Sequence, residues 1–341
     1  MKKFVAGGAA LLMSTTLAHA GGLDRSGQGI GAIFEDGNYA EFSFGYVMPS
    51  VTASSAPYAG EGSVAQPYSS IGFAMRTQVN DNVAFALIVD QPFGAAIEYP
   101  DIGGGAVPMA SVETMSITAL GQYQINERVS AHAGVRMLNG SGSIDLGAFA
   151  NDYSSGSGVG YVVGGAYEIP DIALRVALTY SSAISLELDG ITVPTTLTAD
   201  FPQSVNLDFQ TGIAADTLLF GSIRWADWSA VTVTDSGPAG ELYAPDSDSI
   251  TYNIGVGRRF SDSFAGSVSL GYEKAQGGLA SALAPTDGYF SIQVGGAYTM
   301  DNGVEISGGI RYINVGDATA PTGVFEDNSA IGVGVKVGMS F

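Results

Sequence analysis

The sequence has no cysteine among its 341 residues and few basic residues, with 13 lysines and arginines against 33 aspartates and glutamates. Without cysteine, no disulfide can stabilise the fold and no thiolate can act as a nucleophile or a metal ligand. The formal charge of -20 argues against nucleic acid as a partner, because binding to a phosphate backbone depends on lysine and arginine. Charged residues of both signs make up only 13% of the chain, about half of the usual ~25%.

Long apolar runs are also absent beyond the start of the chain. No later segment has the ~18 consecutive apolar residues that a membrane-spanning helix needs. The start itself has a basic pair, Lys2 and Lys3, then an apolar run over residues 4–17, and then residues 18–20 (AHA) before Gly21. This order is typical of a signal peptide with an A-x-A cleavage site. We therefore expect residues 1–20 to be removed and the mature chain to be exported into a bacterial envelope.

Patterns for catalysis and metal binding are missing as well. Once the signal peptide is removed, His132 is the only histidine, and no serine motif marks a nucleophile that would act with it. We interpret His132 as a polar structural residue and expect no enzyme activity, no cofactor and no metal. One loop contains four acids, Asp235, Glu241, Asp246 and Asp248, which leave open a Ca²⁺ site or a divalent bridge to lipopolysaccharide. A solvated loop is the simpler interpretation.

The last residues of the chain alternate strictly between apolar and small or polar side chains. Val333, Val335, Val337 and Met339 lie on one face, and the opposite face is formed by glycine, serine and Lys336. A period of two predicts a β-strand. A soluble sandwich would also allow such a strand, but an aromatic C-terminus directly after an apolar run that faces lipid is typical of an outer-membrane barrel.

Most of the chain repeats one unit, which is two strands joined by a short turn and followed by a long loop. Six short turns rich in Asn, Asp, Gly, Pro or Ser recur every ~40 to 50 residues, at 79–82, 126–127, 170–171, 215–216, 261–263 and 301–303. The strands that they join are expected to centre on 39–48, 68–78, 82–91, 113–125, 128–138, 158–169, 171–180, 203–214, 217–228, 249–260, 263–274, 288–300, 303–314 and 328–341. We predict an all-β fold, an antiparallel transmembrane barrel of about fourteen strands.

The predicted strands have one apolar and one ionic face. In the strand at 303–314, Ile306 and Ile310 alternate with Glu305 and Arg311. By the same alternation the polar face contains Arg76, His132, Arg136, Arg175, Arg224, Arg259, Arg311 and Lys336, together with Glu41, Asp90, Asp208 and Glu273. A soluble barrel would have to bury the ionic face or expose the aliphatic face, and both are unfavourable in water. We therefore assign the apolar face to lipid and the ionic face to the lumen.

The residues before the first strand, 21–37, are rich in glycine and have no sustained period. We expect them to lie in the periplasm or to fold into the lumen. The predicted organisation is therefore a signal peptide at 1–20, an N-terminal hatch or plug segment at 21–37, and a barrel at 38–341.

Several stretches resemble the FadL family of outer-membrane transporters for hydrophobic compounds. They are residues 90–94 (DQPFG) followed by 98–100 (EYP), residues 225–229 (WADWS) after 201–204 (FPQS), and the terminal strand at 331–341. Their order and spacing resemble the family along nearly the whole mature chain. The resemblance implies a fourteen-stranded barrel with an N-terminal hatch, which carries long-chain fatty acids or aromatic hydrocarbons inward. It further implies a lumen site against the hatch and a lateral exit beside a kinked third strand.

The resemblance also suggests which residues act in transport. Ser26, Gly27 and Gly29 match the Ser/Gly-rich start of the hatch, although the segment of about seventeen residues is short and the family's Asn-Pro-Ala motif is absent. The ligand pathway is expected to include Asp90, Pro92, Phe93 and Gly94, with Arg76 and Arg136 on the lumen face.

Pro92 is the most informative of these residues. Proline has no N–H, so it removes a hydrogen bond from a β-ladder and is confined to strand starts, edges and bulges. Pro92 therefore either begins an extracellular loop or interrupts a longer strand. The alternation of Phe93, Ala95, Ile97 and Tyr99 after the proline favours an interrupted strand.

Taken together, these observations predict a bacterial outer-membrane channel that takes up fatty acids or aromatic hydrocarbons by passive diffusion. We expect a monomer in contact with outer-membrane lipid and lipopolysaccharide. A diffusion porin for polar solutes is one alternative, because an ionic lumen alone permits it. A structural or surface-recognition barrel, with acidic loops that serve adhesion, is the other.

Overall fold

The computed structural model describes residues 23–102 and 108–341. The predicted signal peptide, residues 1–20, lies outside the described residues. Within the described ranges, no helix is long and apolar enough to cross a membrane.

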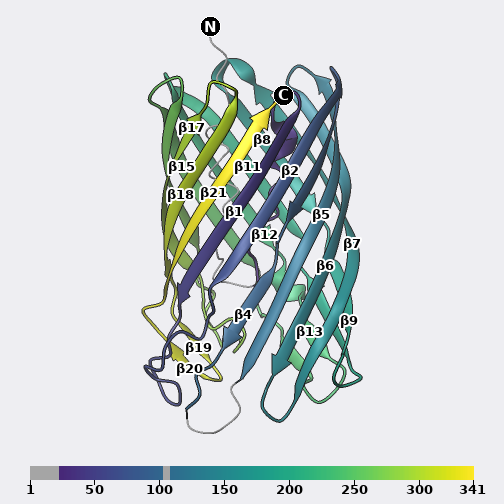
Figure 1. Cartoon of the computed structure of the whole chain (residues 1–341), viewed down its shortest axis with the longest axis vertical. Helices are drawn as coiled ribbons and strands as arrows, with labels where there is room; N and C mark the ends of the chain where they lie inside the picture. Colours follow the sequence, from purple (N-terminus) through teal and green to yellow (C-terminus); the bar gives the residue numbers. More distant parts are fainter. Residues whose placement is uncertain (1–22, 103–107) are drawn as a thin grey trace.

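One antiparallel sheet of fifteen strands closes on itself to form a barrel (Figure 1). Strands β3 and β4 both pair with β5 and occupy the same place in the wall, so the barrel has fourteen strand positions, and the β3–β5 pairing closes it. The strands are β1 (Tyr39–Ser50), β2 (Tyr68–Asn80), β3 (Val83–Asp90), β4 (Gly94–Glu98), β5 (Met109–Asn126), β6 (Val129–Asp145), β7 (Ala150–Ile169), β8 (Leu174–Ser181), β11 (Ser204–Ala214), β12 (Thr217–Ala226), β15 (Ser249–Arg259), β16 (Phe264–Glu273), β17 (Tyr289–Thr299), β18 (Val304–Val315) and β21 (Ser329–Ser340). The predicted fourteen-stranded barrel is confirmed.

The short turns fall where the sequence predicts them, at one end of the barrel, and the C-terminus lies at the same end (Figure 1). Asn80 and Asn126 show why these residue types occur there. The side-chain oxygen of each accepts hydrogen bonds from backbone N–H groups two and three residues later, which fixes the turn. Asp216 adopts a φ of 55° in another of these turns, a conformation that Asp tolerates better than most residues.

The two faces of the barrel are inverted relative to a soluble protein. In β21, the side chains of Val335 and Met339 are 43% and 39% exposed, whereas Lys336 between them is 5% exposed and bonds Glu41 at 2.7 Å. The assignment of the apolar face to the outside is therefore confirmed for this strand. Most strands follow it, so large aliphatic and aromatic side chains cover the outer surface. Such a surface is suited to lipid and would be unfavourable in water.

The long-loop end contains more β-structure than the sequence predicts. Residues 181–202 and 229–248, expected to be irregular loops, form a four-stranded sheet of β9 (Ile184–Asp189), β10 (Thr196–Phe201), β13 (Val233–Asp235) and β14 (Glu241–Tyr243). Three barrel strands, β5, β6 and β7, are also longer at this end than predicted. A further pair, β19 (Ala318–Ala320) and β20 (Gly323–Phe325), lies at the same end (Figure 1).

Glycines of β7 explain why this inner sheet can pack against the wall. A Cβ atom at Gly158 would clash with the backbone oxygen of Ser185 in β9, and a Cβ atom at Gly156 would clash with that of Glu187. The β9–β10 hairpin therefore lies directly on the glycine face of β7. Its apolar residues, among them Leu186 and Phe201, join Leu23, Phe93 and Trp228 in a buried cluster, which we call the mouth core.

Three short 3₁₀ helices complete the described structure. They are η1 (Gly31–Phe34) before the first strand, η2 (Pro170–Ile172) in the turn between β7 and β8, and η3 (Trp228–Ala230), which places Trp228 in the mouth core.

Candidate functional site: a strand break and the N-terminal segment

The third position of the barrel wall is interrupted. Strand β3 ends at Asp90, opposite Ser116 of β5, and β4 resumes at Gly94, opposite Glu113. Three residues, 91–93, thus stand against two on β5, so the chain bulges at this point. Phe93 turns inward and is 1% exposed, with its backbone N–H donating to Thr114 Oγ1 at 3.0 Å. The interpretation of Pro92 as an interruption within a strand is confirmed, and its interpretation as the start of a loop is wrong.

This interruption leaves part of the neighbouring strand unpaired. Strand β2 pairs with β3 only from Phe73 to Asn80, so residues 68–72 have no ladder partner on this side among the described residues. A side-chain hydrogen bond crosses here, from the Ile71 N–H to Gln91 Oε1 at 2.9 Å. Beyond it, β4 bonds to the loop before β2, through Gln66 N to Ala96 O at 2.9 Å. We call the stretch between residues 68–72 and residues 91–95 the wall gap.

The described part of the N-terminal segment, residues 23–37, forms hydrogen bonds with the bulged residues from inside the barrel. Asp24 forms a β-bridge with Phe93, in which the Arg25 N–H donates to Pro92 O and the Gly94 N–H donates to Leu23 O, both at 2.7 Å. The carbonyl of the proline and the amide of the glycine are thereby satisfied, as buried backbone groups require. The bulged residues and the N-terminal segment are therefore structurally coupled.

Arg25 occupies the wall gap itself. Its guanidinium carbon lies 4.0 Å from the centre of the Tyr68 ring, and a Cβ atom at Gly94 would lie 2.5 Å from the same carbon. The side chain is buried, at 8% exposure, and is attracted by the nearby negative charge of Glu113. Gly94 leaves the space that the guanidinium fills, which explains glycine at this position.

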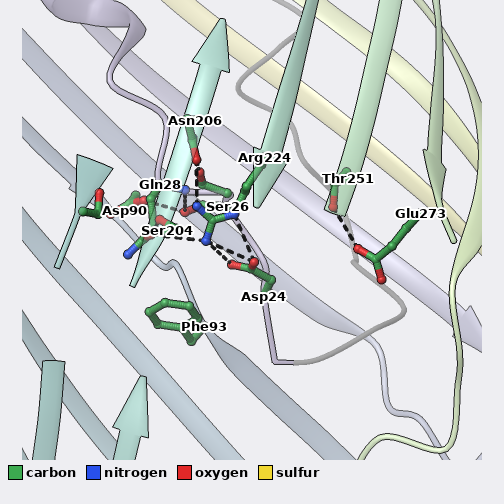
Figure 2. Close-up of polar contacts among 12 residues, drawn as sticks. Asp24, Ser26, Gln28, Asp90, Phe93, Ser204, Asn206, Arg224, Thr251 and Glu273 are labelled. Carbon is green, nitrogen blue, oxygen red and sulfur yellow. Dashed lines mark hydrogen bonds and ion pairs between the residues drawn. The ribbon is translucent and has the colours of Figure 1, made fainter. Parts of the chain in front are cut away.

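Behind the gap, a polar cluster fixes the N-terminal segment to the far wall (Figure 2). Arg224 of β12 forms a buried ion pair with Asp24 at 3.1 Å, and it also donates to Gln28 Oε1 at 3.2 Å. Gln28 accepts a further hydrogen bond from Ser204 Oγ at 3.0 Å. On the other side, Ser26 Oγ donates to Asp90, the last residue of β3. The cluster therefore ties the strand break to β11 and β12 across the lumen.

The other predicted site residues have different surroundings. Arg76 donates to the backbone oxygens of Ile33 and Gly37 and so holds the end of the N-terminal segment. Arg136 is 2% exposed and donates to Thr118 Oγ1 at 2.8 Å and to Ser181 Oγ at 3.1 Å.

Two of the predicted glycines belong to the same segment. Gly27 has a φ of 64°, which favours glycine, and its carbonyl accepts a hydrogen bond from Asn206 Nδ2 at 3.0 Å. Gly29 borders a cavity of about 100 Å³ whose described lining combines apolar residues, such as Ile30 and Ile88, with charged ones that include Glu35 and Lys336.

A small apolar cavity lies next to the strand break, within the mouth core. It has a volume of about 20 Å³ and is bordered by Leu23, Leu186, Leu197 and Phe201, with no charged side chain among its described lining residues. The rings of Phe93 and Phe201 stack at 4.7 Å, and Trp228 meets Phe93 edge-on at 6.0 Å. The inward-turned phenylalanine of the bulge is therefore a member of the apolar interior.

A larger cavity opens among the long loops. It has a volume of about 620 Å³ and is bordered by residues 241–247, 276–287 and 317–326 in part. Five carboxylates, Glu241, Asp246, Asp287, Asp317 and Glu326, are among its described lining residues, and none of these residues is Lys, Arg or His.

Comparison with known proteins gives a consistent picture at the level of structure. No protein-family model and no curated protein matches the sequence. Among solved structures, a FadL homologue from Pseudomonas aeruginosa has a TM-score of 0.76 at 14% identity, over 99% of this chain and 100% of that one. The toluene transporter TodX of Pseudomonas putida has a TM-score of 0.67 at 14% identity, over 97% and 98% of the two chains. The toluene transporter TbuX of Ralstonia pickettii has a TM-score of 0.63 at 13% identity, over 91% of each. The chain has the fold of the FadL homologue.

With this fold established, the site residues that sequence reasoning missed can be named. Asp24, Arg25 and Gln28 make the central contacts, yet they lie in a stretch without periodicity and contact residues as far away as Arg224. The sequence does contain one indication of these contacts. Arg224 falls on the lumen face by alternation, and a buried arginine requires a carboxylate or several acceptors nearby.

The four acidic loop residues agree only in part with the solvated loop that we expected, because Glu241 and Asp246 are exposed whereas Asp235 is buried. Asp235 is 2% exposed and accepts hydrogen bonds from Tyr153 at 2.8 Å and Thr195 at 2.6 Å. Burial raises the pKa of Asp235, but these hydrogen bonds outweigh burial and hold the pKa below its ordinary value. Asp248 accepts from Trp225 Nε1 at 3.0 Å. Across residues 23–102 and 108–341, no group of three His, Cys, Asp or Glu side chains is arranged to hold a metal ion.

Proposed function

We propose that this protein is an outer-membrane channel for the uptake of hydrophobic small molecules by passive diffusion. The observation that carries the proposal is the wall gap beside the mouth core, where an unpaired stretch of the barrel wall meets a buried apolar interior. The similar solved structures support it, because two of them are transporters of toluene.

The proposed path follows the apolar residues. A ligand enters among the long loops, passes into the mouth core at Leu186 and Phe201, and reaches Phe93 at the strand break. It then leaves sideways through the wall gap into the membrane. A lateral exit keeps the ligand out of the aqueous periplasm, and each buried CH₂ group favours the apolar phase by about 0.8 kcal/mol.

In this proposal the N-terminal segment serves as a plug that must yield. Residue Leu23 borders the apolar cavity and Arg25 fills the wall gap, so both must shift before a ligand can pass. The protein would act as a monomer in the outer membrane, with its acidic loops toward the lipopolysaccharide.

The experiment that tests the proposal compares two solute classes. We expect cells that express the protein to take up radiolabelled toluene faster than vector controls, and proteoliposomes that contain it not to swell in sugar solutions. Swelling at the rates of a porin, without faster toluene uptake, would contradict the proposal and indicate a porin for polar solutes. Normal toluene uptake in cells from which the protein has been deleted would favour a structural or recognition role.

A further inference from the structure

Among the described residues, each buried arginine next to the strand break is attracted by an acidic residue. There are three such arginines, Arg25, Arg136 and Arg224. Arg224 is ion-paired with Asp24 at 3.1 Å, both side chains being less than a tenth exposed. The negative charge of Asp90 attracts Arg136, and that of Glu113 attracts Arg25. Asp235, which is buried and accepts a hydrogen bond from Tyr153 of the mouth core, adds a further carboxylate, so the described residues near the mouth core carry no excess of positive charge.

The next charged residues along the wall do not alter this balance. Arg311 donates to Ser291 Oγ and lies 5.4 Å from the centre of the Tyr289 ring, and Glu273, which is 2% exposed, accepts from Thr251 at 2.8 Å (Figure 2). These two residues add one buried cation and one buried anion, so the sum of the charges is unchanged. An anionic ligand would add a net negative charge to this interior, where the low dielectric makes an unpaired charge unfavourable.

The apolar cavity offers no polar substitute for such a partner. Thr114 and Ser141 are the only hydroxyl side chains among its described lining residues, and the Thr114 hydroxyl already donates to Phe93 O at 2.6 Å. The cavity is only about 20 Å³, the size of one water molecule, so a ligand must displace its lining side chains, and a carboxylate among them would lose its hydration without gaining the donors that a buried anion needs. A neutral apolar group would not have a comparable free-energy cost of desolvation.

The cavity among the long loops, where a ligand would enter, also disfavours anions. The cavity among the long loops is bordered by five carboxylates and, among its described lining residues, by no cation. A cavity lined by one sign of charge focuses the field and lowers the local concentration of ions of that sign. Anions are therefore disfavoured before they reach the mouth core as well as within it.

From these four observations we infer that the channel takes uncharged apolar molecules and discriminates against amphiphilic carboxylates, including fatty-acid anions. The inference rests on the proposed function and narrows its ligand from hydrophobic compounds in general to the neutral class.

Two ligands of nearly equal size that differ in charge test the inference. We choose 4-ethylbenzyl alcohol and 4-ethylbenzoate, and measure binding to the mature chain in detergent at pH 7.5 by tryptophan fluorescence. The chain has two tryptophans, and Trp228 lies within the mouth core. We expect the alcohol to bind at least about ten-fold more tightly than the benzoate, the factor that a charge penalty of about 1.4 kcal/mol would give.

Removal of one balancing carboxylate should abolish the preference. The variant Asp24→Asn leaves Arg224 without its ion-pair partner, so 4-ethylbenzoate should bind about ten-fold more tightly than to the unmodified protein, while the alcohol changes by less than about two-fold. Glu113→Gln, beside Arg25, gives a second variant that does not depend on the buried pair. The control is Asp216→Asn, which removes a carboxylate from the ion pair with Arg259 in a short turn at the opposite end of the barrel.

Each outcome is decisive. Equal or tighter binding of the benzoate by the unmodified protein would overturn the inference and leave the proposed function intact. Binding of neither compound, together with no toluene uptake, would overturn both. An unchanged benzoate affinity in both Asp24→Asn and Glu113→Gln, with each variant correctly folded, would show that charge balance at the break does not set the selectivity.

Discussion

If the protein is the proposed channel, substitution of Arg25 by alanine should make it more permeable. The guanidinium fills the wall gap and stacks on Tyr68 at 4.0 Å, whereas the hydrogen bonds of residues 23–25 to the bulge involve backbone atoms only. Arg25→Ala therefore removes the obstruction but keeps the N-terminal segment in place. A desolvated cation–π contact stabilises by about 2 kcal/mol, so its loss would raise the open fraction by up to roughly 30-fold.

The assay is the initial rate of channel-dependent toluene uptake, measured in cells at matched amounts of folded protein. We expect the rate to rise several-fold, below the 30-fold limit of the contact energy, because other steps also restrict passage. The matched control is Arg259→Ala, an arginine in a partly exposed ion pair with Asp216 and outside the proposed path. Liposome swelling with glucose should stay negative in both variants, since the Asp24 to Arg224 cluster still fills the lumen.

The result that would refute this reasoning is an Arg25→Ala variant with normal assembly and an unchanged or lower rate. An unchanged rate would mean that the wall gap is not on the path of the ligand. A lower rate would mean that Arg25 contributes to passage and does not obstruct it.

Four further predictions follow from the fold. Gly94→Arg adds a second guanidinium to the wall gap, where Arg25 already lies, so toluene uptake should be lost although the barrel still assembles; full uptake would exclude the wall gap as the exit. Val335→Arg should cost about 2 to 4 kcal/mol because the residue faces lipid, whereas Gly334→Ser on the lumen face should be tolerated, and denaturant unfolding in lipid would show whether the two differ. Gly158→Val should displace the β9–β10 hairpin and expose the long loops to protease, while Val159→Ala, on the outer face of the same strand, should not. The unmodified protein should migrate differently in SDS before and after boiling, because a closed sheet has no edge at which to open; identical mobility would contradict the barrel.

The barrel can be predicted from the sequence because a strand that separates lipid from a polar lumen repeats the same two-residue pattern many times. Lys336 is the simplest case. Its position in the alternation predicts a lumen-facing side chain, and the lysine is indeed buried against Glu41. Pro92 is a second case, because missing ladder hydrogen bonds follow directly from its missing N–H.

The segments that fill the inside of the barrel are harder to predict from the sequence, for two physical reasons. The contacts of Asp24 and Gln28 with Arg224 depend on how a glycine-rich segment turns at Gly27, and no periodic pattern records such a turn. The β9–β10 hairpin did leave a signal, since Ile184, Leu186 and Leu188 alternate with polar residues. That pattern is too short to separate a strand from a loop, and its burial depends on glycines in a different strand.

The distribution of residue types along the inner wall explains why the position of the strand break matters for the proposed path. Toward the long loops, the lumen-facing residues of β5 and β6 are apolar, as at Ala110 and Ile144, and they belong to the mouth core. Toward the short turns the same faces contain polar residues, such as Thr118 and His132, which are 0% and 2% exposed, but Leu120 of β5 belongs to a second apolar cluster with Ile30 and Ile33. The buried ion pair of Asp24 and Arg224 lies behind Phe93 (Figure 2). On the proposed path, an apolar molecule at Phe93 therefore has an ion pair ahead of it and a gap in the wall beside it, and the lateral route is favoured because it leaves that pair intact.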